Sequence, residues 1–161
     1  IMETNIIFVG TNEDKEVVLI YGSIYGHTAD AVDMLATQLD NLGVGNLKVY
    51  DASNVDVSYL VAESFRCSHI VVASSTYNGA IFTPIERYLS EIISRNLQNR
   101  TVAIVENGTW SSISGNLITK ELEKMKNITL LGNRVSIRAA TNEQNLESIK
   151  ALAEEICESL K

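Results

Sequence analysis

The chain has few of the residue types that hold disulfide-rich or metal-centred folds together. Its two cysteines, Cys67 and Cys157, lie far apart in the sequence and form no Cys-x-x-Cys pattern. Two ordinary buried thiols in a reducing compartment are a simpler interpretation than a disulfide. With only two histidines, His27 and His69, we expect no histidine-rich metal site.

Long apolar runs are also missing. No stretch reaches the length of a membrane span, and the first residues have neither the basic region nor the apolar region of a signal peptide. We therefore expect a cytoplasmic protein that does not enter a membrane. The first residue is Ile1 rather than Met, which is typical of a processed chain or of a piece of a longer protein.

Basic residues are outnumbered, with 13 Lys and Arg against 20 Asp and Glu and a formal net charge of −7. A field of this sign disfavours nucleic acid and anionic membranes and favours a basic partner. An acidic protein that binds a dianion must do so through local dipoles. The hydrophobic fraction of 45% in 161 residues predicts one domain with a two-sided core.

What is present is a regular alternation of apolar strands and amphipathic helices. Residues 1–16 are weakly patterned and are interpreted as a leader or interdomain linker, and residues 17–161 as the folded domain. The segment Thr83-Pro-Ile-Glu86 predicts a helix start capped by Thr83, and further helices are predicted over about 115–126 and from about 142. The predicted strands cover residues 17–21, 47–50, 70–74, 101–105 and 130–138, the last with a bulge at a Gly-Asn break. This alternation predicts an α/β fold, an open, doubly wound five-stranded parallel sheet with helices on both faces.

The loop after the first predicted strand has the composition of a phosphate site. Tyr21-Gly-Ser-Ile-Tyr-Gly-His-Thr28 holds two glycines and two hydroxyl residues, Ser23 and Thr28, and no Lys or Arg. A strand that enters a helix through such a loop leaves backbone N–H groups pointing at one spot, where the helix dipole adds positive charge. The same composition also suits an ordinary tight turn, so the loop alone leaves both interpretations open.

Two further loops are predicted at the same edge of the sheet. In open α/β sheets ligands bind beyond the carboxyl ends of the strands, which places residues 22–28, 75–82 and 106–114 together. The second loop contains Tyr77 and the third contains Trp110, the only tryptophan. Two aromatic side chains at one edge are suited to hold a flat ring between them, although either one alone is as well explained by packing on its own loop.

These three loops together resemble the flavodoxin family. The segments are Ser23-Ile-Tyr-Gly-His-Thr28, Ser74-Ser-Thr-Tyr-Asn-Gly79 and Asn107-Gly-Thr-Trp110, and they are most similar to the flavodoxin-like domain of flavodiiron (A-type) flavoproteins. The first is similar to Ser-x-Tyr-Gly-Asn-Thr, with His27 at the Asn position. The resemblance covers about residues 17–161, and it rests on three motifs in the right order rather than on any one of them.

The resemblance implies strand order 2-1-3-4-5 in a three-layer α/β/α fold that binds FMN without a covalent bond. The first loop would hold the phosphate, the second would line the isoalloxazine ring, and Trp110 would stack on it. Glu106 replaces a small residue and is expected to disfavour reduced, anionic flavin. The residues expected to bind the cofactor are Ser23, Ile24, Tyr25, Gly26, His27, Thr28, Ser75, Thr76, Tyr77, Asn78, Gly79, Asn107, Gly108, Thr109 and Trp110.

The function implied is electron transfer through FMN to or from a redox partner or attached domain, of the di-iron or rubredoxin-like kind. Two histidines cannot supply the di-iron site of flavodiiron proteins, so the chain would be the electron-donating half. A homo-oligomer is left open. One alternative is an FMN-dependent NAD(P)H:quinone reductase of the same fold. Another is a flavin-free signalling domain, disfavoured because the predicted strands end in Tyr21-Gly-Ser and Ser-Ser-Thr rather than in acidic residues.

Overall fold

A parallel β-sheet forms the centre of the molecule in the computed structural model, which describes residues 14–108, 113–138 and 141–161. The sheet order is β2-β1-β3-β5-β6, with β7 also paired to β5, and all of these pairings are parallel. The predicted order is therefore confirmed. The strands are β1 (Asp14–Gly22), β2 (Lys48–Asp51), β3 (Cys67–Tyr77), β4 (Ala80–Ile81), β5 (Arg100–Asn107), β6 (Ile128–Leu130) and β7 (Val135–Ile137).

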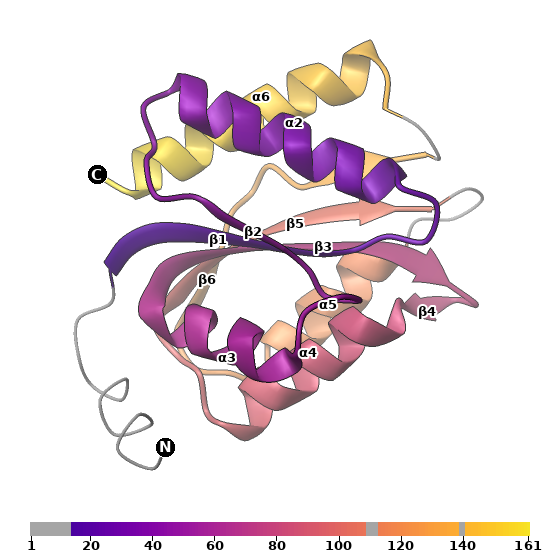
Figure 1. Ribbon diagram of the computed structural model, residues 1–161, viewed down its shortest axis with the longest axis vertical. Helices are drawn as coiled ribbons and strands as arrows, with labels where there is room; N and C mark the ends of the chain where they lie inside the picture. Colours follow the sequence, from indigo (N-terminus) through magenta and orange to yellow (C-terminus); the bar gives the residue numbers. More distant parts are fainter. Residues whose placement is uncertain (1–13, 109–112, 139–140) are drawn as a thin grey trace.

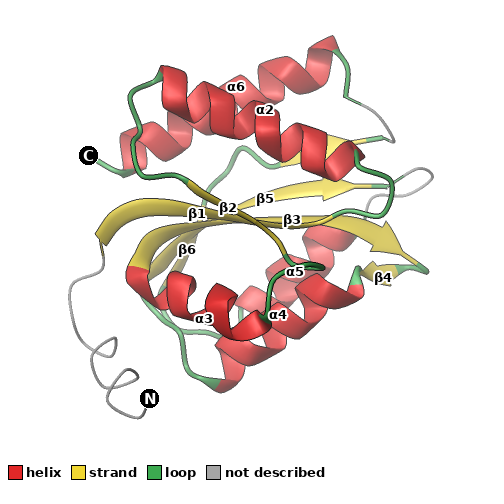
Figure 2. Cartoon of the chain, viewed as in Figure 1, coloured by secondary structure: helices red, strands yellow, loops and turns green. Residues whose placement is uncertain are grey.

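Helices cover both faces of the sheet, which gives the three layers seen in Figures 1 and 2. One layer holds α2 and α6, and the other holds α3, α4 and α5. The helices are α2 (His27–Asn41), α3 (Val57–Arg66), α4 (Thr83–Ser94), α5 (Ser114–Leu122) and α6 (Glu143–Ser159).

The central strands are apolar on both sides because each side meets a helical layer. In β3, Ile70 and Val72 face α3, α4 and α5, whereas Val71 and Ala73 face α2 and α6. All four are at most 2% exposed. Complete burial of a Val or Ile side chain contributes about 1.5–3 kcal/mol, so the two cores strongly favour this register over a slipped one.

Two predicted elements differ from the structure at the sheet's far edge. The last strand is not one bulged strand but two short ones, β6 and β7, separated by residues 131–134. Gly132 and Asn133 in this break donate backbone N–H groups to the Glu155 carboxylate of α6, at 3.1 and 2.9 Å. The helix predicted over about residues 115–126 is α5, which ends earlier, at Leu122. Met125 lies beyond the end of the helix but is still buried in the core.

Helix α4 starts one residue earlier than predicted. Phe82, not Thr83, is its N-cap residue, and no side chain caps the helix. Pro84 lies in the first turn, as its missing N–H allows. The helix predicted from about residue 142 is α6, and Asn142 is its N-cap residue, since Asn142 and Asn145 exchange hydrogen bonds in a capping box.

The first strand begins at Asp14, three residues before the boundary drawn from the sequence, and the leader interpretation of the residues before it lies outside the described part of the chain. Among the described residues, no helix has both the length and the apolar composition that crossing a membrane requires. The described residues also contain no group of three or more His, Cys, Asp or Glu side chains placed to bind a metal ion.

Candidate functional site

The carboxyl ends of β1, β3 and β5 meet at one edge of the sheet, at the point where strand order reverses between β1 and β3. A hollow of about 160 Å³ lies there. Such a switch point is where open α/β sheets bind ligands. The hollow is lined by residues of all three predicted loops, namely Ile24, Tyr25, His27, Ser75, Thr76, Asn107 and Gly108.

The first loop forms a turn that aims the start of α2 at this hollow. Gly26 has φ 89° and ψ −13°, a left-handed conformation that glycine adopts without the penalty of a Cβ atom. The Ser23 hydroxyl accepts a hydrogen bond from the Gly26 N–H at 3.0 Å, which closes the turn. No side chain caps α2, so the N–H groups of its first turn remain available to a ligand.

Thr28 lies in the same loop but faces the other two loops. Its side chain is fully buried, and its hydroxyl lies 2.9 Å from the Ser75 hydroxyl at the end of β3. It also accepts a hydrogen bond from Asn107 Nδ2, at the end of β5, at 3.3 Å. Thr28, Ser75 and Asn107 thus form a buried polar chain that joins the three loops. We call it the Thr28–Ser75–Asn107 chain.

The second predicted loop is mostly strand. Thr76 and Tyr77 continue β3 and pair with Ile81 and Ala80 of β4 in an antiparallel hairpin. Its turn is Asn78-Gly79, with φ values of 49° and 72°, the pair of positive angles that a type I′ turn requires. The Asn-Gly pair is the sequence signal for this hairpin, which replaces the open loop expected over residues 75–82.

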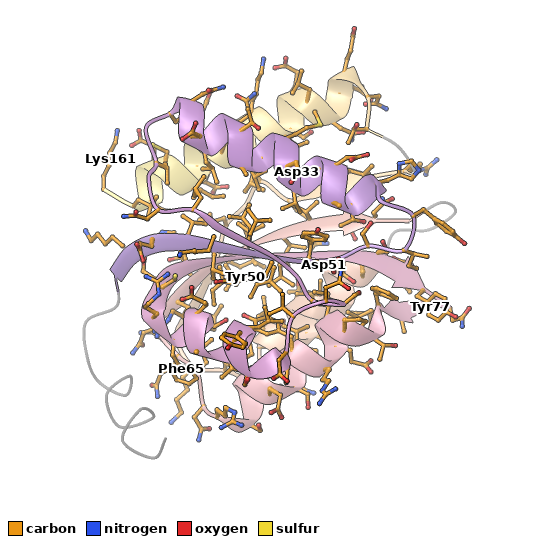
Figure 3. All side chains as sticks on the ribbon, viewed as in Figure 1. Asp33, Tyr50, Asp51, Phe65, Tyr77 and Lys161 are labelled. Atoms are coloured by element: carbon orange, nitrogen blue, oxygen red, sulfur yellow. The ribbon has the colours of Figure 1, made fainter. Side chains whose placement is uncertain are left out.

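Tyr77 stands at the outer edge of this hairpin, where Figure 3 labels it. Its side chain is 48% exposed, and its ring meets the Phe82 ring edge-on, with centroids 6.2 Å apart. Tyr25, in the first loop, is 85% exposed. Tyr25 lines the hollow, whereas Tyr77 lies next to Thr76, a residue that does line it. The other aromatic residue expected here, Trp110, and its neighbour Thr109 lie outside the described residues.

The third loop is held at both of its described ends. Gly108 N–H donates to the Ile137 carbonyl of β7 at 3.1 Å. At the other end, the backbone N–H groups of Ile113 and Ser114 both donate to the Thr76 hydroxyl at 3.3 Å. Thr76 therefore caps α5 from a neighbouring strand and ties the second loop to the third.

Glu106 is a residue whose position the sequence did not predict. It is 5% exposed, and its carboxylate accepts hydrogen bonds from Gly115 N–H at 2.9 Å and from the Ser136 hydroxyl. Arg134 lies 3.9 Å away and also donates hydrogen bonds to two side chains of α5, those of Asn116 and Thr119. The Glu106 carboxylate therefore faces α5. Gly115 was the available signal, because a Cβ there would lie 2.7 Å from Glu106 Oε1.

Among the residues that the structure describes, no Lys or Arg lines the hollow. The pKa of Tyr21, at the end of β1, is raised by burial and then by the negative charges of Asp51 and Asp33. Figure 3 labels these two carboxylates at the end of β2 and on α2. An anion bound here would be held by backbone and hydroxyl dipoles.

His69 and Cys67 lie at the opposite, amino end of β3. Cys67 is fully buried in the core. His69 is 7% exposed and joins the Ser68 hydroxyl, at 2.6 Å, to the Ser159 hydroxyl at the end of α6, at 2.8 Å. This histidine fastens the last helix to the sheet and has no contact with the hollow.

Comparisons with known proteins found relatives in sequence and in fold, although no known family model matches the chain. Over 151 residues it is 24% identical to a diflavin flavoprotein A of Nostoc sp., and the match covers 94% of this chain and 26% of that protein. The chain thus spans about a quarter of that relative's length.

Two solved structures show the fold. The rubredoxin oxygen:oxidoreductase of Desulfovibrio gigas superposes with a TM-score of 0.88 at 20% identity, over 95% of this chain and 38% of that one. A flavodoxin from the domain Archaea superposes with a TM-score of 0.77 at 21% identity, over 90% of this chain and 98% of that one. The expected flavodoxin-like fold is confirmed.

Proposed function

We propose that this chain, which has the flavodoxin-like fold, binds FMN and passes electrons through it to or from a redox partner. One observation carries the proposal. The uncapped start of α2 opens at the topological switch point of the sheet, where the Thr28–Ser75–Asn107 chain joins it to the ends of β3 and β5. These hydrogen bonds join the loop proposed to bind the phosphate to the two loops proposed to bind the ring.

The donor set fits a phosphate monoester. The first-turn N–H groups of α2, the helix dipole and the Ser23 hydroxyl supply donors and partial positive charge, and no basic side chain is needed. The backbone at Gly26 is accessible to a ligand, since no described atom lies within 4 Å of its hypothetical Cβ position. His27, the first residue of α2, lines the hollow as a further polar group.

The ring would lie across the strand ends, between the hairpin that carries Tyr77 and the third loop at Asn107 and Gly108. Bound FMN supplies one- and two-electron chemistry. The residues around it set the potentials by binding the oxidised and reduced forms with different strengths, and a difference of about 1.4 kcal/mol shifts a one-electron potential by about 59 mV. The net charge of −7 would disfavour a negatively charged reduced ring.

The partner is proposed to be a di-iron or rubredoxin-like protein or attached domain. Two relatives support this class. The aligned segment is only 26% of one of them, a diflavin flavoprotein, and the other is named a rubredoxin oxygen:oxidoreductase. The described residues hold no group of side chains suited to a metal of their own. The electrons would therefore leave this chain before they reach a metal.

The test is the colour and content of the purified protein. We expect a yellow protein that releases FMN, and neither FAD nor riboflavin, when it is denatured, or a colourless protein that turns yellow when FMN is added. A protein that binds no flavin under either condition contradicts the proposal. Rapid steady-state oxidation of NAD(P)H with a quinone would instead favour the reductase alternative.

A further inference from the structure

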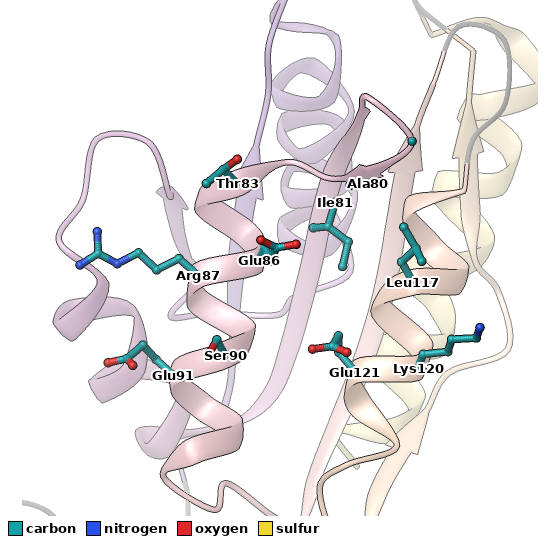
Figure 4. Close-up of a pocket in the computed structure, with 11 residues that line it drawn as sticks. Ala80, Ile81, Thr83, Glu86, Arg87, Ser90, Glu91, Leu117, Lys120 and Glu121 are labelled. Carbon is teal, nitrogen blue, oxygen red and sulfur yellow. The ribbon is translucent and has the colours of Figure 1, made fainter.

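A second hollow, larger than the one at the strand ends, lies between α4 and α5. It has a volume of about 610 Å³ and is closed at one end by the β3–β4 hairpin (Figure 4). Ile81 of the hairpin, which is 6% exposed, and the half-buried Leu117 of α5 provide apolar surface inside it. We call it the α4–α5 groove.

Two acidic side chains point into this groove, whereas a third, Glu91, and the basic ones point away from it. In Figure 4, Glu86 of α4 and Glu121 of α5 turn their carboxylates toward each other's helix, across the groove. Arg87 and Lys120, which also border the groove, extend outward on opposite sides. The groove therefore presents negative charge above an apolar floor, although both signs of charge occur on its two helices.

The carboxylates of Glu86 and Glu121 make no strong ion pair with other described residues. Glu86 has no ion pair or side-chain hydrogen bond with any described residue. Within the described part of the chain, Glu121 pairs only with Lys124, one turn later, at 2.8 Å, and the Lys124 side chain is 57% exposed. An exposed pair of this kind is weak and screened by salt, so a cation from a partner can replace it.

We propose that the α4–α5 groove docks a basic segment of the redox partner. A Lys or Arg side chain would lay its aliphatic stem on Ile81 and Leu117 and place its charged end between Glu86 and Glu121. The net charge of −7 would attract such a partner over a longer range. Charge complementarity and the apolar floor together identify the occupant as a basic protein surface.

The groove also lies beside the proposed flavin site. Gly79 lines the groove, and Thr76, on the other strand of the same hairpin, lines the hollow at the strand ends. A partner seated in the groove is thus separated from the ring site by one hairpin. That the occupant is a redox protein rests on the proposed function, whereas the docking of a basic surface does not.

The test uses cytochrome c, a basic haem protein, as the probe. FMN-loaded protein is reduced photochemically with EDTA as the electron donor, and one electron then passes from the flavin to the ferric haem. The variant is Glu86→Gln with Glu121→Gln, which changes the formal charge from −7 to −5 (−7 + 2). The control is Glu147→Gln with Glu154→Gln, which makes the same change on exposed positions of α6, in the opposite helical layer.

At low ionic strength we expect the groove variant to lower the second-order rate constant at least fivefold and the control by less than about twofold, because docking is steered by local charge. The difference should vanish at about 0.5 M salt, where the Debye length is only a few ångströms. Ferricyanide, a small anionic acceptor, should show no loss in either variant. Equal losses in the groove variant and the control would overturn the proposal.

A second measurement separates the docking from the flavin. The flavin-free full chain, labelled with ¹⁵N, is titrated with cytochrome c and the amide shifts are mapped. We expect the shifts to gather on α4, α5 and residues 79–81. Shifts gathered on α6 or elsewhere would overturn the groove. A protein that binds no FMN but shows the expected shifts would contradict the proposed function and leave the docking surface intact.

Discussion

Ser23 and Thr28 look equivalent in the sequence and differ in the structure. Both are hydroxyl residues in one glycine-containing loop, and both were expected to donate to a phosphate. The Ser23 hydroxyl lies in the turn that faces the start of α2, whereas the Thr28 hydroxyl is buried against Ser75 and Asn107. The two residues should therefore affect different parts of cofactor binding.

Replacing Ser23 with Ala should weaken FMN by about 10- to 100-fold, as expected for a hydrogen bond to a charged group, and leave riboflavin nearly unchanged. Replacing Thr28 with Val keeps the shape and removes the hydroxyl that Ser75 and Asn107 share. That variant should weaken FMN and riboflavin by the same factor. Fluorescence titration with both flavins measures this, and a loss confined to FMN for Thr28→Val would assign its hydroxyl to the phosphate.

Gly115 is required by its distance to Glu106. A Cβ atom there would meet Glu106 Oε1 at 2.7 Å and Cδ at 2.9 Å. We expect Gly115→Ala to lower the free energy of unfolding by about 1–2 kcal/mol, since the clash exceeds the helix propensity that alanine gains. Gly45→Ala, where no atom lies within 4 Å, is the matched control for urea unfolding. Equal urea midpoints for the two variants would show that the Glu106 side chain moves aside for the new Cβ atom with no loss of stability.

The starts of α4 and α6 show that a capping pattern in the sequence does not always form a cap in the fold. Thr83-Pro-Ile-Glu86 has the pattern of a capping box, yet Phe82 occupies the cap position and Thr83 makes no capping bond. Asn142 does cap α6, through its side chain and that of Asn145. Asn142→Ala should therefore cost about 1 kcal/mol of unfolding free energy, and Thr83→Ala less than about 0.5 kcal/mol. Urea unfolding decides this, and a larger loss at Thr83 would restore the original prediction.

The attachment of α6 to the sheet should depend on pH through His69. Burial lowers the pKa of His69, an effect that outweighs its hydrogen bond to Ser159, and the charge of Lys15 lowers it further. The unfolded chain then binds a proton more readily than the folded one. Stability from this residue is complete above the ordinary histidine pKa of about 6.5 and is lost as the pH falls below it.

Unfolding free energies of the protein and of His69→Gln at pH 7.5 and pH 5 measure this effect. The protein should lose more stability than the variant over this interval, because all other titrating groups are common to both. Equal losses would show that His69 takes up its proton without disturbing its contacts to Ser68 and Ser159.

The net charge of the chain bears on how FMN is held. A protein of charge −7 repels a dianion at long range, while the amides and dipoles at α2 act only at short range. Raising NaCl from about 20 mM to about 0.5 M should therefore strengthen FMN binding several-fold and leave riboflavin binding unchanged. A fall in FMN affinity with salt would mean that a Lys or Arg side chain holds the phosphate, contrary to the composition of the hollow.

The layered sheet and the place of its site were predictable because they depend on local patterns. Apolar runs such as residues 70–74 require cover on both faces, and a strand that enters a helix through Gly26 leaves that helix start open. The free-energy cost of exposing an apolar side chain, or of leaving a backbone N–H without a partner, depends on the residue itself and not on distant parts of the chain. The alternating strands and helices, the two-sided cover of the sheet and the loops at its carboxyl edge follow from these patterns, whereas the strand order was implied by the resemblance of the three loops to the flavodoxin family.

The tertiary structure alone decided which polar group meets which. Thr28 could have faced a phosphate or the neighbouring loops, and Glu106 could have faced the ring or α5. Their partners lie 47 or more residues away for Thr28, and 9, 28 and 30 residues away for Glu106. Such pairings depend on how distant strands and helices pack, because a buried hydroxyl or carboxylate takes whichever partner the assembled core brings within hydrogen-bond distance.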